Sequence, residues 1–248
     1  MKTRTAAALV SITISQAAWS QVQPARLEAG LTAGMVIYQG DLTPLRPGAV
    51  NTPGFNANIF GSYLLNRSYS IRGNIVLGSI RGDDATYSTP DYRRRRNFQF
   101  SGLFGEFTGL LVWNIRANNG NEPLKKIHPY VFAGAGVSML RITRDWSRFN
   151  AEYFSGEPDV LQGLEADISH PMPRVIPVVP LGAGARYFIS ERLSVIAEGS
   201  YRLTETDYLD GFSKAANADR KDHYTTVNVG IVYRLGTGKK YDCPVVMR

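Results

Sequence analysis

Residues 193–203, LSVIAEGSYRL, and residues 225–235, TTVNVGIVYRL, alternate apolar side chains with polar or very small ones. An alternation with a period of two residues indicates a β-strand that has one apolar face and one polar face. In a soluble protein the apolar face would point into a core. Because each stretch has about ten residues, the same pattern also fits a strand of a membrane barrel, whose apolar face contacts lipid.

Six further stretches show similar patterning, so that eight strands can be placed along the chain. The predicted strands are about 26–38, 53–64, 68–80, 98–113, 129–141, 178–189, 193–204 and 223–235. The fourth is the least regular, because its alternation changes phase around Gly102–Gly105, and a β-bulge is the simplest explanation. The length of the chain suits a single all-β barrel domain.

The connections between the predicted strands alternate in length. Leu65–Arg67 and Ser190–Arg192 are short, and 114–128 is intermediate. The long polar connections are 39–52, 81–97, 142–177 and 205–222. Short turns at one end and long loops at the other are typical of outer-membrane barrels, and a soluble sandwich or lipocalin-like barrel has no reason to sort its loops this way. We therefore predict an eight-stranded antiparallel transmembrane β-barrel with short periplasmic turns, long extracellular loops and both termini in the periplasm.

Aromatic residues provide an independent indication. Five of them lie on the predicted lipid face close to the short-turn ends of their strands: Tyr63, Tyr69, Trp113, Tyr187 and Tyr233. Aromatic rings at the membrane–water boundary form such a girdle in membrane barrels. Half-buried tyrosines at strand ends of a soluble β protein are the alternative.

The first twenty residues have the features of a secretory signal peptide. Lys2 and Arg4 precede the apolar stretch Ala6–Ile14, and Ala18-Trp19-Ser20 resembles a cleavage site. No later stretch has the ~18 apolar residues that a membrane helix needs. We expect a signal peptide at 1–20, an outer-membrane barrel at 21–235 and a periplasmic tail at 236–248. The expected location is the outer membrane of a Gram-negative bacterium.

The polar face of the predicted strands carries six charged residues: Glu28, Arg72, Glu106, Arg186, Glu198 and Arg202. An eight-stranded barrel has an interior that is only wide enough for side chains to fill. Opposite charges in that interior are expected to pair and to cross-link the strands, since an unpaired buried charge is costly. An ion pathway through the barrel is the functional alternative.

Residues for catalysis or metal binding are few. His128, His170 and His223 do not have metal-ligand spacing, and no nucleophile elbow occurs. His223 with Thr204 or Ser200 is the nearest approximation to the site of a lipid-modifying enzyme. No catalytic, cofactor-binding or metal site is therefore expected, and no small-molecule substrate.

The predicted outer loops contain two groups of charged residues. The acids Asp83, Asp84, Asp207 and Asp210 are either a calcium site or, as we expect, solvated carboxylates, because no EF-hand pattern accompanies them. The basic run is Arg93, Arg94, Arg95 and Arg96. Arginine matches phosphate groups, so this run is a candidate contact for lipopolysaccharide, with a solvated loop tip as the alternative. The net charge of +7 on an exported chain favours anionic lipid headgroups over nucleic acid, which is not an expected partner.

The chain continues beyond the last predicted strand. Residues 236–248 are basic and end in apolar residues, and they contain Lys239, Lys240, Tyr241 and Cys243. This segment is a candidate docking peptide for a periplasmic partner, with a disordered remnant as the alternative. Cys243 is the only cysteine, which excludes an intramolecular disulfide.

Several short motifs resemble one known family. They are Tyr38-Gln-Gly-Asp-Leu42, Arg81-Gly-Asp-Asp84 followed by Arg95-Arg96-Asn97-Phe98, the segment 128–137 (HPYVFAGAGV), and the segments 180–187 (PLGAGARY), 198–202 (EGSYR) and 206–210 (TDYLD). In order and spacing they resemble the Bacteroidota outer-membrane β-barrel family that includes PorG of the type IX secretion system, over nearly the whole mature chain.

The resemblance implies a non-enzymatic outer-membrane component of a protein secretion apparatus. Members of this kind are associated with a periplasmic ring of partner proteins, so the expected partners are ring proteins together with outer-membrane lipids and lipopolysaccharide. The alternatives are a lipid-modifying barrel enzyme, similar to a lipid A deacylase, and a generic structural barrel.

Overall fold

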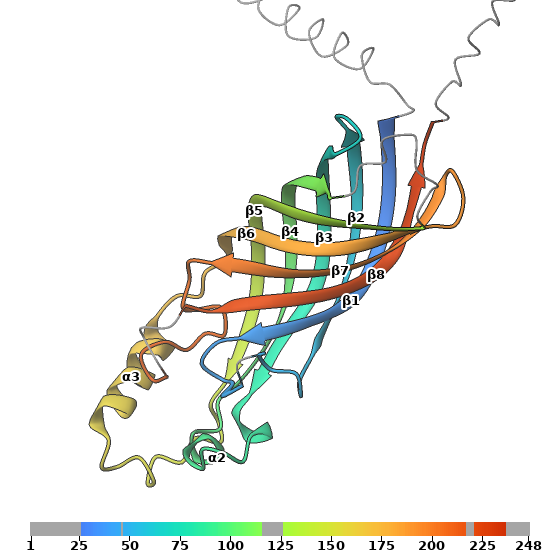
Figure 1. Cartoon of the computed structure of the whole chain (residues 1–248). Coiled ribbons are helices and arrows are strands. Elements are labelled where there is room, and N and C mark those ends of the chain that lie inside the picture. Colours follow the sequence, from blue (N-terminus) through green and yellow to red (C-terminus); the bar gives the residue numbers. More distant parts are fainter. Residues whose placement is uncertain (1–25, 46, 116–125, 217–220, 237–248) are drawn as a thin grey trace, which may run out of the picture.

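The computed structural model describes residues 26–45, 47–115, 126–216 and 221–236. Within them, eight antiparallel strands follow one another around a closed barrel, and β8 pairs with β1 (Figure 1). The strands are β1 (Leu27–Gln39), β2 (Gly54–Leu64), β3 (Tyr69–Asp83), β4 (Gln99–Asn114), β5 (Ile127–Asp145), β6 (Val175–Phe188), β7 (Leu193–Thr204) and β8 (His223–Arg234). The predicted all-β, eight-stranded antiparallel barrel is confirmed, and each predicted strand overlaps its observed counterpart.

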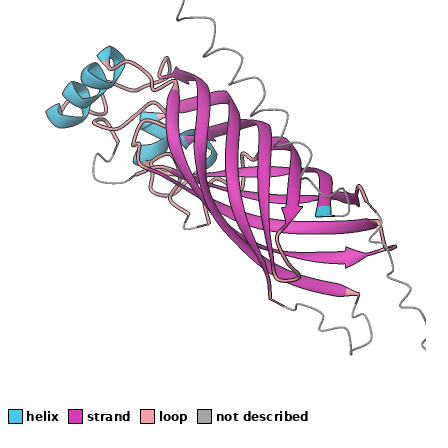
Figure 2. Cartoon of the chain, turned by 90° about the horizontal axis from the view of Figure 1, so that it is seen from above, coloured by secondary structure: helices cyan, strands magenta, loops and turns pink. Residues whose placement is uncertain are grey.

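The two ends of the barrel differ in their connections. Residues 65–68 and 189–192 form tight turns at one end, where β1 also begins and β8 ends. At the opposite end lie the connections 40–53, 84–98, 146–174 and 205–222, with the short helices α2 (Tyr92–Arg96) and η2 (Asp84–Thr86) and the longer α3 (Pro158–Ser169) (Figures 1 and 2). We call these the short-turn end and the long-loop end.

Side chains that bond to the local backbone form the tight turns. The Asn66 carboxamide accepts hydrogen bonds from the Ser68 and Tyr69 amides, both 2.8 Å long. In the other turn, Oγ of Ser190 accepts a 3.0 Å hydrogen bond from the Leu193 amide. Asn and Ser favour turns because their short side chains can replace a backbone acceptor.

Side-chain burial alternates along every strand, as the sequence predicted. Apolar residues in the middle of the strands point outward, and Leu31, Ile59, Ile75, Leu111 and Val229 are 42–62% exposed. Inward positions include most of the buried polar and charged residues of the strands, together with aromatic and some aliphatic residues. A barrel that exposes its apolar face and buries its polar face has the reverse of the pattern expected in water.

The predicted β-bulge in β4 is wrong. The pairing of β3 with β4 runs without interruption from Tyr69 opposite Trp113 to Asp83 opposite Gln99. The pairing of β4 with β5 is equally continuous. The apparent change of phase arises because Phe100 and Phe104 are apolar yet point inward, where both are buried. At these two positions the inward-facing side chains of β4 are apolar, while the register of β4 with its neighbours stays the same.

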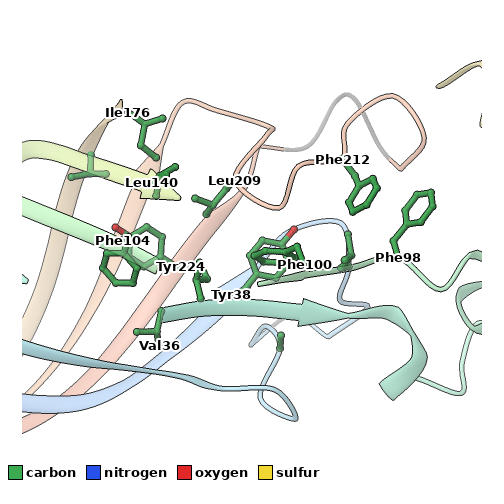
Figure 3. Close-up of a cluster of buried hydrophobic side chains, with 14 of the residues drawn as sticks. Val36, Tyr38, Phe98, Phe100, Phe104, Leu140, Ile176, Leu209, Phe212 and Tyr224 are labelled. Carbon is green, nitrogen blue, oxygen red and sulfur yellow. The ribbon is translucent and has the colours of Figure 1, made fainter. Parts of the chain in front are cut away.

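The largest of the three buried hydrophobic clusters in the described residues lies toward the long-loop end. Tyr38 and Phe100 contact each other edge to face, and Phe104 packs near Tyr224 (Figure 3). This hydrophobic cluster continues into the loops, where Phe98 and Phe212 stack with ring centroids 4.2 Å apart. The loops therefore close the long-loop end by packing onto the barrel interior.

Residues 142–177 were expected to form a long polar connection, but the helix α3 lies within them. It begins at Pro158, and proline is favoured in the first turn of a helix. Leu164 on this helix is buried in the hydrophobic cluster. No helix of the described residues is long and apolar enough to cross a membrane.

Candidate functional site

The barrel interior contains three groups of paired charges, of which the first lies near the short-turn end. Glu28 on β1 accepts hydrogen bonds from Arg186 on β6 at 2.9 and 3.0 Å. The same carboxylate accepts a 3.1 Å bond from Arg234 on β8. Arg234 was absent from the predicted set, although its inward phase in β8 is visible from the alternation of residues 225–235.

The second group lies farther from the short turns. Arg72 on β3 forms an ion pair with Glu198 on β7, and the Tyr130 hydroxyl on β5 donates a 2.6 Å hydrogen bond to the same carboxylate. The Arg72 guanidinium lies 4.4 Å from the centre of the Phe60 ring, a cation–π contact. All four side chains are at least nine-tenths buried.

The third group is centred on Glu106 of β4, whose side chain is fully buried. The Tyr224 hydroxyl on β8 donates a 2.6 Å hydrogen bond to it, and Arg202 on β7 lies 3.4 Å away. Arg202 also donates to the hydroxyls of Ser200 and Thr226. The carboxylate is thus held by a cation and a phenol from two adjacent strands on the opposite wall.

The structure brings all six predicted interior charges into ion pairs. The pairs join β1 with β6, β3 with β7, and β4 with β7, none of which are neighbours in the barrel. A charge buried in a low-dielectric interior is costly unless a partner compensates it. The paired side chains therefore cross-link opposite walls and occupy the space that a channel would need.

A fourth charged cluster lies in the loops of the long-loop end. The buried carboxylate of Asp84 accepts hydrogen bonds from Arg93 at 2.9 Å and from Arg96 at 2.7 Å. Both guanidinium groups also donate to the backbone carbonyl of Asp41. Together they fasten the loop between β3 and β4 to the loop between β1 and β2.

The loops of the long-loop end differ from two sequence-based expectations. Arg93 and Arg96 are buried and paired, so only Arg94 and Arg95 of the basic run are exposed. Asp84 and Asp210 are fully buried instead of solvated. A five-residue helix, α2, causes the first difference, because it turns the first and last arginine of the run to the same side.

Two carboxyl groups of the loop between β7 and β8 share one phenol. The Tyr38 hydroxyl lies 2.5 Å from Oδ2 of Asp210 and 2.8 Å from Oδ1 of Asp222. A phenol has one proton to donate, so both contacts are satisfied when one carboxyl group is itself protonated. Burial raises the pKa of both carboxyl groups well above the ordinary value, and the neighbouring negative charges, Asp210 for Asp222 and Asp41 for both, raise it further.

Asp167 near the end of α3 connects this loop to the loop between β5 and β6. Its buried carboxylate accepts hydrogen bonds from the amides of Ser213, Lys214 and Ala215, at 2.9–3.1 Å. Arg144 donates to the carbonyls of Asp167 and Gly211, at 2.6 and 3.0 Å. We call the packed loops, with the Asp84, Asp210 and Asp167 clusters, the loop cap.

The five predicted girdle residues all lie on the outward face near the short-turn end. Tyr69 and Trp113 are directly opposite each other on β3 and β4, and each is at least 40% exposed. Tyr187 and Tyr233 have similar exposure, and Tyr63 is half-buried. They occupy β2, β3, β4, β6 and β8.

Of the residues considered for a lipid-modifying enzyme, His223 lies next to Thr204, whose backbone amide lies 3.4 Å from Nδ1 of His223, but the hydroxyls of Thr204 and Ser200 have other partners. Ser200 is buried inside the barrel, where its hydroxyl contacts Arg202 and Thr226. His223 contacts the ring of Tyr201, and Thr204 donates to the carbonyl of Asp222. Among the described residues, no group of three or more His, Cys, Asp or Glu side chains is arranged to hold a metal ion.

Two predicted segments lie outside the described residues. They are the signal peptide at 1–20 and most of the C-terminal tail, with its four candidate docking residues Lys239, Lys240, Tyr241 and Cys243.

Solved structures with a similar arrangement include several barrels. Ail, the attachment invasion locus protein of Yersinia pestis, is 12% identical, with 84% of this chain and 98% of Ail covered and a TM-score of 0.43. Neisserial surface protein A is 13% identical, and the match covers 84% of this chain and 96% of that protein, with a TM-score of 0.42. The outer membrane protein OprG from Pseudomonas aeruginosa is 9% identical, and the match covers 83% of this chain and 94% of OprG, with a TM-score of 0.43.

A comparison with curated proteins found no match. The model of the outer membrane protein beta-barrel domain matches residues 6–234, a range that includes all eight strands. The chain therefore belongs to the outer membrane protein beta-barrel domain family.

Proposed function

We propose that this outer-membrane barrel is a non-enzymatic component of a type IX secretion apparatus, similar to PorG, and that it docks a periplasmic ring of partner proteins. The observation that carries the proposal is the filled interior. Three groups of ion-paired side chains occupy the barrel, and the loop cap packs onto its long-loop end. A barrel whose interior is occupied by its own side chains is expected to act through its surfaces.

The short-turn end supports a docking role. In the proposed orientation it faces the periplasm, as is usual for the short turns of outer-membrane barrels. Its exposed charged residues are mostly basic: Arg26, Arg67, Lys126 and Arg192, against the acid Glu191. Strand β8, which precedes the tail with Lys239 and Lys240 in the sequence, ends at the same end of the barrel. This end suits an acidic partner surface, because complementary charge steers association and fixes orientation.

The test is co-purification from native membranes after chemical cross-linking. The full chain is compared with a variant that ends at Gly236 and with a variant carrying R67Q and R192Q. We expect the full chain to capture periplasmic ring proteins, and both variants to lose most of that capture and of cargo secretion. R94Q/R95Q is the matched control, because it removes two exposed arginines from the opposite end.

Each result bears on a different part of the proposal. If the truncated chain captures the ring and supports secretion as the full chain does, the tail is not the docking segment. If the full chain captures no periplasmic protein and its removal leaves secretion unchanged, the secretion role is wrong. A change in lipid A mass on removal of the gene would favour the lipid-modifying alternative.

A further inference from the structure

The outward face of the barrel carries charge at one place only within the described strands. The outward-facing charged residues are Arg81 and Asp83 on β3, and Arg141 and Asp145 on β5. All four lie near the long-loop end, on strands that flank β4. The other strands present apolar, small or uncharged residues outward up to their ends.

Strand register places the two arginines near each other. Arg81 is opposite Ser101 on β4, and Ser101 is opposite Thr143 on β5. Arg141 lies two residues from Thr143 on the same face, opposite Leu103. With strands about 4.8 Å apart, the two arginine Cα atoms lie on the order of 12 Å apart across β4. Two flexible arginine side chains can contact one small anion over that separation, with the hydroxyls of Ser101 and Thr143 between them.

The height of these residues matches a lipid headgroup. Arg81 lies twelve residues along β3 from Tyr69 of the girdle. With a rise of about 3.3 Å per residue and a tilt of about 40°, it lies about 30 Å from the girdle, beyond an apolar band about 25 Å tall. Arg141 lies ten residues from Val131, which is opposite Trp113, and so is at the border of that band. A charge on the lipid face is tolerated best at that boundary.

The nearby acids Asp83 and Asp145 are not within ion-pair distance of these arginines in the described part of the chain. Asp83 accepts a 2.8 Å hydrogen bond from the Ala85 amide, and Asp145 accepts one of the same length from the Ser147 amide. Within the described part of the chain, neither Arg81 nor Arg141 forms an ion pair. Arg93 and Arg96, by contrast, are fully engaged by Asp84.

We propose that Arg81 and Arg141, with Ser101 and Thr143, bind a phosphate group of a lipopolysaccharide molecule that lies against β3–β5. Arginine binds phosphate through paired, charge-assisted hydrogen bonds, and an apolar strand surface below the site accommodates acyl chains. The site does not depend on the secretion role. In this proposal the phosphate ligands are Arg81 and Arg141, and not the arginines of α2.

The test uses the full mature chain, refolded in detergent and supplied with defined lipids. The probes are diphosphoryl lipid A, the same lipid after removal of its phosphates, and inorganic phosphate as a competitor. Lipid retained through purification is counted by native mass spectrometry. Retention by R81Q/R141Q is compared with that by R94Q/R95Q, a control that removes the same charge from exposed positions of α2.

We expect R81Q/R141Q to retain at least about tenfold less diphosphoryl lipid A than the wild type, and R94Q/R95Q to retain as much as the wild type. The dephosphorylated lipid should not distinguish the variants, and millimolar inorganic phosphate should not displace the bound lipid. The single variants R81Q and R141Q, each expected to lose part of the retention, provide the test if the double variant does not fold. Unchanged retention in the folded variants, or an equal loss in the control, would overturn the site. Displacement by inorganic phosphate would replace the lipid site by a simple anion site.

Discussion

Glu28 on β1 and Arg186 on β6 form a 2.9 Å ion pair, although their strands lie on different sides of the barrel. Arg234 on β8 completes this group from a third strand. Among the described residues, Glu28 is the ion-pair partner of both guanidinium groups, so its removal leaves both without a paired carboxylate. Both ion pairs therefore depend on a single side chain, which is 3% exposed.

Replacing Glu28 tests this dependence. We expect E28A to lower the free energy of unfolding by about 3 kcal/mol, since it removes the partner of the largely buried Arg186 guanidinium and of the partly exposed Arg234 guanidinium. Urea titration of the refolded barrel, followed by tryptophan fluorescence, measures the change. R192Q in the exposed turn between β6 and β7 is the control, and its effect should stay within about 0.5 kcal/mol. Equal effects of the two substitutions would mean that the ion pair contributes nothing to stability.

A double-mutant cycle tests the Arg72 and Glu198 pair. R72M leaves a carboxylate buried, with the Tyr130 hydroxyl as its remaining partner, and should cost about 3–5 kcal/mol. Adding E198Q removes the unpaired charge while an amide still accepts from Tyr130, so the double variant should be more stable than R72M alone. The same unfolding measurement applies. A double variant whose loss equals the sum of the two single losses would exclude energetic coupling between the side chains.

The Asp84 cluster is predicted to hold the loop between β3 and β4. R96Q removes two charge-assisted hydrogen bonds to Asp84 and one to the Asp41 carbonyl, so local opening of this loop should become easier. Limited proteolysis should cleave the loop at least several times faster in R96Q than in the wild type. R94Q, the exposed neighbour in the same helix, should be cleaved at the wild-type rate. Similar rates for both variants would contradict the pairing.

The Tyr38, Asp210 and Asp222 cluster predicts that closure of the loop between β7 and β8 depends on pH. Because burial raises the pKa of both carboxyl groups, the closed loop keeps a proton that the released loop loses above about pH 4. The free energy that favours the closed loop is therefore largest at low pH. For each proton that the closed loop retains, it falls by up to about 1.4 kcal/mol per pH unit, until the pH exceeds the raised pKa. Arg96, whose charge favours ionised Asp210, limits the effect.

Hydrogen exchange of the amides at 209–215 between pH 5 and pH 9 measures this dependence. After correction for the intrinsic rate, wild-type protection should decline as pH rises. In D222N one carboxyl group can no longer ionise, so the decline should be smaller while the hydrogen bond to Tyr38 is kept. Protection that rises with pH in the wild type would contradict the shared proton.

Much of the barrel could be predicted from the sequence because strand alternation is a local property. The side of the sheet on which Glu28 or Arg202 lies follows from its phase within one strand. At Phe100 and Phe104 the inward-facing residues are apolar, so the polarity of a residue no longer indicates the side of the sheet on which it lies. Polarity alone therefore suggested a bulge that does not exist. Arg234 has the alternation phase of an inward residue, but it is the last residue of β8 and was not included among the predicted interior charges.

The loop cap could not be predicted from strand alternation. Asp84 is buried because two arginines of α2 fold back onto it, and Asp167 is buried because three amides from the loop between β7 and β8 approach it. These partners are far apart in sequence or depend on a short helix with little periodicity of its own. Charged residues in a loop look solvated until such tertiary partners are known.

In this account, the side chains of the barrel close its own interior. Conductance of the purified full-length protein in planar lipid bilayers tests this claim most directly. Because the Glu28, Glu198 and Glu106 groups fill the interior in succession, we predict no stable open channels at neutral pH and moderate voltage. Stable openings of large conductance, seen in the wild-type protein and absent from protein-free bilayers, would contradict it.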